Sequence, residues 1–247
     1  MDEKDLNGTK RFVSDGLATE NDCKSLLEMV TLFAQQGDGY KGHMSPHTEM
    51  EKFEGLTVGR AALLVYFGFL DRKALELYLK ITENAKQHLE EQFNLKRKLY
   101  FNYTHLVCRS ALPNSPSNRT DFSHAVHADN CNLISNGLCE KLPPAYTWRD
   151  YSAILYLNHD FKGGEFIFSG DFDGNVVQSS IRPKCGRMVG FSSGAENLHG
   201  VRAVKQGTRC AVALWFTFDK KHAETDRNVA FELIEEDPFK ALAELLS

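Results

Sequence analysis

The chain has no apolar run long enough to cross a membrane. Such a span needs about 18 consecutive apolar residues. The most apolar stretch, residues 61–70, is shorter than that and is predicted to be a core helix. The first residues, Met-Asp-Glu-Lys-Asp, are polar and acidic, unlike the start of a signal peptide. The sequence therefore favours either a cytosolic protein or a piece cut from a longer secreted one.

Basic charge is also scarce. The chain has 29 Lys and Arg against 33 Asp and Glu, a formal net charge of −4. No basic stripe runs along it, which argues against nucleic acid as a partner. Hydrophobic residues make up 42% and charged residues 25%. This balance is typical of an ordinary globular domain, and a chain of this length can bury a full core.

None of the six cysteines forms a Cys-x-x-Cys pair, which argues against a structural zinc site. Cys131 and Cys139 flank a glycine-containing loop and could form a short disulfide. We favour the alternative of free, partly buried thiols, because the compartment is unknown. Glycosylation sequons stand at Asn7, Asn102 and Asn118, a weak excess over the roughly 1.5 expected by chance. Asn102 lies inside a predicted strand, which is a poor glycan site.

The hydrophobic periodicity of the sequence changes near residue 95. Residues 18–95 have helical periodicity, with Leu26, Val30 and Phe33 on one face after Thr19 as a cap. Residues 71–93 repeat this pattern. Between the two helices, residues 36–53 are rich in Gly, His and Ser and are predicted to be a loop.

From residue 98 onward, short runs of strand-forming residues are separated by Gly, Asn, Asp and Pro. The runs cover residues 100–107, 151–157, 165–168, 176–181, 187–191, 201–204 and 210–218. This pattern predicts a mainly β sandwich or barrel of about seven or eight strands. We expect one structural unit with an N-terminal helical support (1–95), a β core (96–220) and a C-terminal helical tail (221–247) with a helix over residues 239–246.

The segment His127-Ala128-Asp129 is the most informative for chemistry. In an extended strand, residues two apart project to the same side, so both side chains can reach one metal ion. His199 is the candidate for a third ligand. Two imidazoles and one carboxylate on one side of a metal are typical of non-haem Fe(II) oxygenases.

Arg209 follows ten residues after His199, at the start of an apolar strand. An arginine that points into a β core is costly unless its charge is paired. Its planar guanidinium suits a carboxylate held by two parallel hydrogen bonds. An internal bridge to Asp or Glu is one interpretation. With three candidate ligands upstream, we favour the distal carboxylate of 2-oxoglutarate as the partner.

Longer segments make the order of these residues more specific. They are HADNC at 127–131, PPAYT at 143–147, RDYSA at 149–153, GGEFIF at 163–168, PKCGRM at 183–188 and CAVALWFT at 210–217, with GDGY at 37–40, SPHT at 45–48 and EKFEG at 51–55 upstream. Over roughly residues 10–220, the chain closely resembles the catalytic domain of collagen prolyl 3-hydroxylases, the leprecan family. This family lies within the superfamily of 2-oxoglutarate- and Fe(II)-dependent dioxygenases.

The resemblance implies a double-stranded β-helix, or jelly-roll, core with flanking helices. It implies that His127, Asp129 and His199 bind iron and that Arg209 binds the 2-oxoglutarate carboxylate. Tyr156 stands where related prolyl hydroxylases use a tyrosine hydroxyl on that carboxylate, and Tyr103 is a weaker candidate for the same role. The implied cofactors are Fe(II), 2-oxoglutarate, O2 and ascorbate.

The implied reaction is hydroxylation of C3 of proline in a collagen-like Gly-X-Y chain, with release of succinate and CO2. The implied partners are a proline-rich polypeptide and collagen-modifying chaperones, with neither nucleic acid nor membrane. Leprecans have an additional helical-repeat region, and this chain ends Leu-Leu-Ser without a retention signal. The location is therefore the endoplasmic reticulum lumen by resemblance, or the cytosol or nucleus for a short relative. Two alternatives remain: a hydroxylase of another protein, and a non-catalytic collagen-binding or chaperone module.

The sequence has several other aromatic and histidine residues near the predicted site. Tyr146 and Trp148, in a proline-bearing loop, are proposed to cover the proline ring of a substrate. His124 is interpreted as a loop residue that points away from the metal, and Trp215 as core filling. His43 and His47 are interpreted as solvated loop residues rather than parts of a substrate mouth.

Overall fold

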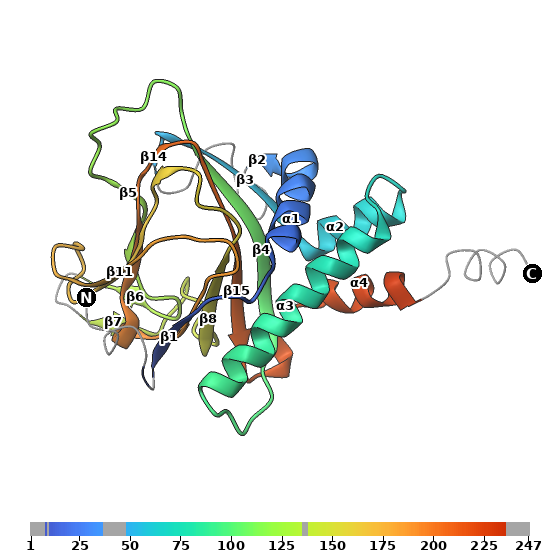
Figure 1. Ribbon diagram of the computed structural model, residues 1–247. Coiled ribbons are helices and arrows are strands. Elements are labelled where there is room, and N and C mark those ends of the chain that lie inside the picture. The colour runs from blue at the N-terminus through green and yellow to red at the C-terminus, as the bar shows by residue number, and fades with distance from the viewer. Residues whose placement is uncertain (1–7, 9, 37–47, 135–137, 236–247) are drawn as a thin grey trace, which may run out of the picture.

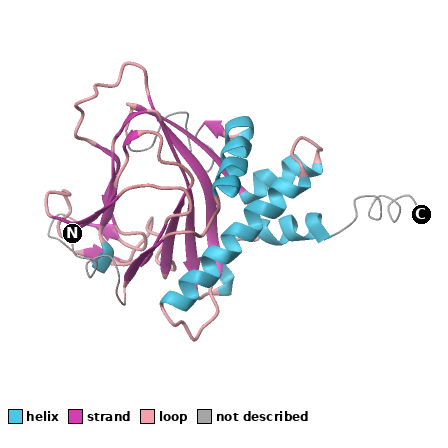
Figure 2. Ribbon diagram, in the orientation of Figure 1, coloured by secondary structure: helices cyan, strands magenta, loops and turns pink. Residues whose placement is uncertain are grey.

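The computed structural model describes residues 8, 10–36, 48–134 and 138–235. Within these ranges, two antiparallel sheets face each other, and helices cover the outer face of the larger sheet (Figures 1 and 2). None of the described helices is long and apolar enough to cross a membrane. The arrangement confirms the predicted jelly-roll core with flanking helices.

Both sheets mix strands that lie far apart in the sequence. The larger sheet has the order β1 (Arg11–Ser14), β12 (Met188–Ser192), β8 (Tyr151–Tyr156), β15 (Thr208–Thr217), β4 (Tyr100–Ala111), β3 (Glu51–Thr57) and β2 (Gln35–Gln36). The smaller has the order β11 (Val177–Ile181), β10 (Phe166–Ser169), β13 (His199–Arg202) and β5 (Phe122–His127). Two short pairs complete the described strands: β14 (Val204–Gln206) with β9 (Lys162–Gly163), and β6 (Asn132–Leu133) with β7 (Cys139–Glu140).

The alternation of β15 decides where a site can form. Successive side chains of a strand point to opposite faces of the sheet. Val212 and Leu214 are buried in the core cluster that the helices share, whereas Arg209 and Ala213 line a cavity between the two sheets. Polar residues of this strand can therefore meet the smaller sheet inside the sandwich.

The helices are α1 (Glu20–Phe33), α2 (Val58–Tyr66), α3 (Arg72–Gln92) and α4 (Asp226–Glu235). The predicted cap of the first is confirmed. The hydroxyl of Thr19 accepts a hydrogen bond from the backbone N–H of Asp22, and the carboxylate of Asp22 accepts one from the backbone N–H of Thr19. Each bond satisfies a backbone donor at the start of the helix.

The structure corrects two predictions for the N-terminal part. Residues 51–53, predicted as the end of a loop, begin β3, and β1 joins the opposite edge of the same sheet. The core helix predicted over residues 61–70 is α2, which ends at Tyr66 and buries only one side. Leu63 is 58% exposed and Tyr66 68% exposed, whereas Ala61 and Ala62 are buried. The helix predicted over residues 239–246 lies outside the described residues.

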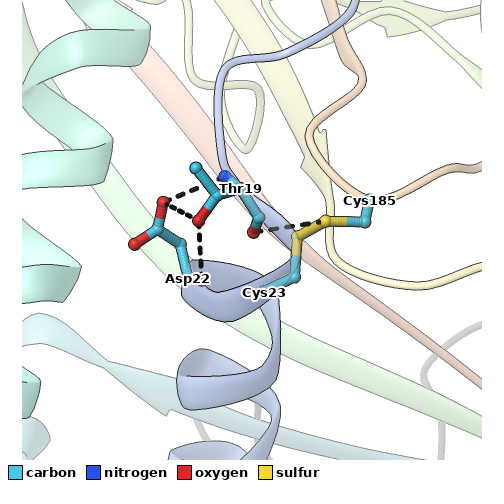
Figure 3. Close-up of a disulfide and its surroundings, with 4 residues drawn as sticks. All are labelled: Thr19, Asp22, Cys23 and Cys185. Atoms are coloured by element: carbon cyan, nitrogen blue, oxygen red, sulfur yellow. Dashed lines mark hydrogen bonds between the residues drawn. A yellow bond between two sulfur atoms is a disulfide. The ribbon is translucent and has the colours of Figure 1, made fainter.

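The prediction of free thiols is wrong, because all six cysteines are paired. The candidate pair Cys131–Cys139 forms, alongside two long-range bridges that the spacing did not indicate. Figure 3 shows the one at the start of α1, where Cys23 is joined to Cys185, whose sulfur lies 3.5 Å from the carbonyl oxygen of Thr19. This bridge fastens α1 to the segment between β11 and β12.

Replacing both Cys23 and Cys185 by serine is expected to lower the free energy of unfolding by about 5 kcal/mol, because the bridge spans 162 residues. The matched double replacement of Cys131 and Cys139, which are eight residues apart, is expected to cost about 2.5 kcal/mol on the same loop-entropy scale. Urea unfolding would measure both. Equal losses would contradict the entropic explanation.

Candidate active site

His127, Asp129 and His199 converge between the two sheets. His127 ends β5 and His199 begins β13, and the two residues are directly paired in register. The backbone N–H of Asp129 donates to the carbonyl of Ser193, which places the carboxylate beside both imidazoles. Nε2 of His127 lies 3.5 Å and Nε2 of His199 3.7 Å from the carboxylate oxygens. One ligand atom from each residue fits within 4.8 Å of the others, as a single metal ion requires.

The hydrogen bonds of the two imidazoles determine which nitrogen is available. Nδ1 of His127 lies 2.8 Å from the carbonyl oxygen of Ala125, and Nδ1 of His199 lies 2.8 Å from that of Asn197. A carbonyl can only accept, so each Nδ1 carries the proton and each Nε2 presents a lone pair. Both histidines are thus in the tautomer that suits metal binding through Nε2.

Asn197 fixes this orientation from outside the triad, although the sequence interpretation missed it. Its side-chain amide donates to the carbonyls of Lys10 and Ser192, so the 3-10 turn Ala195–Asn197 is tied to the start of β1 and the end of β12. The carbonyl of Asn197 is therefore rigidly placed to hold the ring of His199. The sequence signal was only its place two residues before that histidine.

The surroundings of His199 and Asp129 favour the charge states that a metal site needs. His199 lies between the rings of Phe166 and Phe191, and burial lowers its pKa to about 4, with a further lowering from the charge of His127. Burial by itself raises the pKa of Asp129, but His199 and His127 reverse the effect, so it lies well below its usual range. At neutral pH His199 is therefore a neutral imidazole beside the ionised carboxylate of Asp129.

Arg209 lines the same cavity as the His-Asp-His cluster, and Tyr156 lies next to Arg209. Both are buried, and the guanidinium carbon of Arg209 lies 5.7 Å from the centre of the Tyr156 ring. Among the described residues, neither Nε of Arg209 nor the hydroxyl of Tyr156 has a hydrogen-bond partner. No ion pair from Arg209 to an acidic side chain is found there either, so an internal bridge does not explain this buried cation. Its chemistry fits a ligand carboxylate.

Replacing Tyr156 by phenylalanine is expected to weaken 2-oxoglutarate binding roughly tenfold, through loss of one hydrogen bond to a charged group. Burial raises the pKa of Tyr156 to about 12, so the hydroxyl remains a donor at neutral pH. Thermal stability is expected to stay the same or rise, because the hydroxyl has no hydrogen-bond partner in the described part of the chain. Calorimetric titration and thermal unfolding of the same preparations would test this. A clear loss of stability would show that the hydroxyl has a structural partner.

The remaining predicted site residues separate into two groups. Tyr146 is half exposed and lines an outer groove that also contains His127 and Asp129. Trp148 is not among the groove residues and instead stacks on His222, with ring centroids 4.1 Å apart. Tyr103 lies outside the lining of the inner cavity and stacks on Trp215. Of Tyr146, Trp148 and Tyr103, only Tyr146 therefore lies at the mouth of the site.

Two interpretations of individual residues are corrected here. His124 does not point away: its ring stacks on that of His127 at 3.9 Å, and it lines both the inner cavity and the outer groove. Trp215 is not core filling, because it lies where the cavity and groove meet, with the guanidinium of Arg149 4.5 Å above its ring. His43 and His47 lie outside the described residues.

The inner cavity has a volume of about 60 Å³ and the outer groove about 410 Å³. The candidate metal ligands lie at the boundary between them, since His127 and Asp129 line both. A small acid held by Arg209 and a larger molecule in the groove would therefore approach one metal ion from two sides.

Comparison with known proteins agrees with this geometry. Residues 116–217 match the family model described as 2OG-Fe(II) oxygenase superfamily. The fold is similar to that of a viral collagen prolyl hydroxylase from Paramecium Bursaria Chlorella virus-1 (TM-score 0.52, 18% identity, 86% of this chain and 98% of that chain). It is also similar to a prolyl hydroxylase from Trichoplax adhaerens (TM-score 0.54, 16% identity, 89% and 88%). Residues 116–217 are thus a domain of the 2-oxoglutarate- and Fe(II)-dependent oxygenase superfamily, whose members use Fe(II), 2-oxoglutarate and O2.

Within this superfamily, the sequence is homologous to the prolyl 3-hydroxylases. It is 49% identical to human prolyl 3-hydroxylase 1 over 235 residues, which is 95% of this chain and 32% of that protein. It is 51% identical to human prolyl 3-hydroxylase 2 over 230 residues, 93% and 32% respectively. The chain thus spans about a third of the length of the curated relatives it matches.

Proposed function

We propose that this chain is a prolyl 3-hydroxylase oxygenase domain that converts prolyl residues of collagen-like Gly-X-Y chains to 3-hydroxyproline. One oxygen atom of O2 enters the prolyl C–H bond and the other enters succinate, formed from 2-oxoglutarate with loss of CO2. The observation that carries the proposal is that one cavity is lined by a His-Asp-His cluster and by a buried arginine that has no acidic partner among the described residues.

Two groups of residues would bind the iron and the 2-oxoglutarate. His127, Asp129 and His199 would hold Fe(II) on one side, which leaves positions free for the ketoacid and O2. When bound, the iron and 2-oxoglutarate supply the oxidising chemistry that attacks an unactivated C–H bond. Arg209 and Tyr156 would hold the distal carboxylate. Because these anchors come from β8 and β15, the ketoacid would be fixed to the larger sheet.

The outer groove is the proposed place of the polypeptide. A collagen-like chain is extended and locally similar to polyproline, so it needs an open groove rather than a closed pocket. Tyr146 presents an exposed ring there, and the guanidinium of Arg149 lies 3.9 Å from its centre. Aromatic faces suit proline-rich segments. His124 and Trp215 would flank the prolyl ring at the passage to the metal.

Replacing Tyr146 by alanine is therefore expected to raise the KM for a proline-rich peptide roughly tenfold, since an aromatic contact of this size contributes about 1 kcal/mol or more. The KM for 2-oxoglutarate should stay the same. Tyr66→Ala, which replaces another exposed tyrosine, on α2 and outside the groove lining, is the matched control and should change neither constant. An unchanged peptide KM in Tyr146→Ala would remove this residue from the substrate site.

The proposed location is an oxidising compartment, with the endoplasmic reticulum lumen as the specific candidate. Three disulfides support it, because such bridges persist in secretory compartments and are rare in the reducing cytosol. Chaperones that act on collagen remain proposed partners. Of the sequons, Asn118 is exposed, whereas the side chain of Asn102 is engaged with His222 and Arg149. Asn7 lies outside the described residues.

The test is anaerobic loading with Fe(II) and 2-oxoglutarate, followed by O2 and a collagen-like peptide. Fragment-resolved mass spectrometry with hydroxyproline isomer standards would locate the oxygen, and His199→Ala is the control. One oxygen on prolyl C3, absent from the control, is the expected result. Succinate without peptide oxidation would keep the oxygenase and reject this substrate. Neither product, in folded metal-loaded protein, would favour the non-catalytic binding module.

A further inference from the structure

A second arginine lies at the carboxylate-binding end of the cavity. Arg109 on β4 is directly opposite Arg209 on β15. Residues opposite each other on neighbouring strands point to the same face, and both side chains line the inner cavity. Two buried like charges repel each other strongly in such a place. If only one of these arginines is to bind a ligand, the charge of the other has to be neutralised within the protein.

Glu51 on β3 supplies a carboxylate beside Arg109. Its side chain is fully buried, and one carboxylate oxygen lies 4.0 Å from a guanidinium nitrogen of Arg109. The other oxygen lies 3.4 Å from Arg119, which also pairs with Asp121. The guanidinium of Arg109 donates to the carbonyl of Ser123 at 2.8 Å. Arg109 is thus held on the protein, whereas Arg209 has no acidic partner among the described residues.

The same carboxylate also joins the two sheets around the site. It accepts hydrogen bonds from the hydroxyl of Ser123 on β5 and from the backbone N–H of Val204 on β14. The strand β5 ends in the metal-site residue His127. A residue of the larger sheet therefore holds the strand that presents the first histidine.

The charges of this network balance except for that of Arg209. Apart from Arg209, the cluster has two cations, Arg109 and Arg119, and two carboxylates, Glu51 and Asp121, so its charges cancel. Arg209 then remains as the one uncompensated cation of this group. A ligand with a single distal carboxylate, such as 2-oxoglutarate, would complete the balance.

We propose that Glu51 sets the charge selectivity of the 2-oxoglutarate pocket by neutralising Arg109, so that Arg209 alone selects the distal carboxylate. Glu51 is a positioning residue: it acts through Arg109 and is not expected to touch the ligand. The inference rests on the proposed function, because it assumes that the cavity accepts 2-oxoglutarate.

In a double-mutant cycle, the proposal predicts opposite changes in 2-oxoglutarate affinity for the two single variants. A purely structural role would not produce opposite changes. Glu51→Gln leaves an extra positive charge, so the affinity for 2-oxoglutarate should rise roughly three- to tenfold. Arg109→Gln leaves an extra negative charge, so the affinity should fall by a similar factor. The double variant Glu51→Gln/Arg109→Gln restores the balance and should bind 2-oxoglutarate within about threefold of the unmodified protein.

The measurement is anaerobic calorimetric titration of the Fe(II)-loaded full chain with 2-oxoglutarate and, separately, with 2-oxopentanoate. The second acid has the same metal-binding end but lacks the distal carboxylate, so its affinity should shift less. Glu54→Gln is the matched control, because Glu54 is on the same strand and pairs with the exposed Lys52. Breaking a buried ion pair can prevent folding. If Glu51→Gln does not fold, the weakening in Arg109→Gln and its reversal in the double variant carry the test.

The outcomes are distinct. Opposite shifts in the single variants and recovery in the double variant would support the proposal. Weaker binding in all three folded variants would overturn it and would show that the network only holds the strands in place. Equal affinities throughout would overturn it as well. Absence of 2-oxoglutarate binding in the unmodified, metal-loaded protein would overturn the proposed function and this inference together.

Discussion

Asp129→Asn is expected to abolish succinate formation, with a loss of roughly 10³-fold or more. Replacing a residue that merely orients a ligand typically costs 10- to 100-fold in metal affinity or activity, so losing the anionic ligand itself should cost more. Asparagine has nearly the same shape, so the buried position between the histidines remains filled. The change removes the negative charge that stands beside both Nε2 atoms.

Two measurements would separate this effect from misfolding. Equilibrium dialysis against Fe(II) or Mn(II) should show lost binding, and circular dichroism should show an unchanged fold. Asp173→Asn is the control, because Asp173 is an exposed aspartate outside the cavity and groove linings. Full metal binding by Asp129→Asn would contradict the assignment of the His-Asp-His cluster as the metal site.

Arg209→Gln is expected to weaken 2-oxoglutarate binding about 10²-fold while the protein becomes no less stable. Two charge-assisted hydrogen bonds to a carboxylate together contribute about 3 kcal/mol or more. In the absence of ligand, Arg209 has no acidic partner among the described residues, so its removal breaks no ion pair. A buried unpaired charge is unfavourable. The melting temperature is therefore expected to rise, by roughly 2–4 °C for each kcal/mol gained.

Arg209→Lys keeps the charge but loses the planar pair of donors, so it should recover only part of the affinity. Arg182→Gln, an exposed arginine between β11 and β12, should change neither quantity. Calorimetric titration with 2-oxoglutarate and thermal unfolding without it are the two measurements. A strong loss of stability in Arg209→Gln would show a structural ion pair. Unchanged ligand affinity would remove Arg209 from the binding site.

The sequence by itself determined the fold class and much of the chemistry. Strands separated by turn residues require antiparallel sheets, and a helix with an apolar face and a Thr cap forms wherever that face can be buried. The His-x-Asp pair, the later histidine and the arginine stand out because such residues are costly inside a β core without a ligand. Their order and the long matching segments identified the family, because long similar segments rarely arise by chance.

Only the tertiary structure decided which polar residues share a cavity. Glu51 and Arg109 lie 58 positions apart, and the pairing of β3 with β4 in the larger sheet brings them together beside Arg209. The same holds for Cys23 and Cys185, whose spacing gives no indication of contact. Trp215 alternates with buried residues on β15, so its position at the mouth depends on the neighbouring sheet. Local sequence specifies which way a strand alternates, but strand register and the packing of the two sheets specify what each side chain meets.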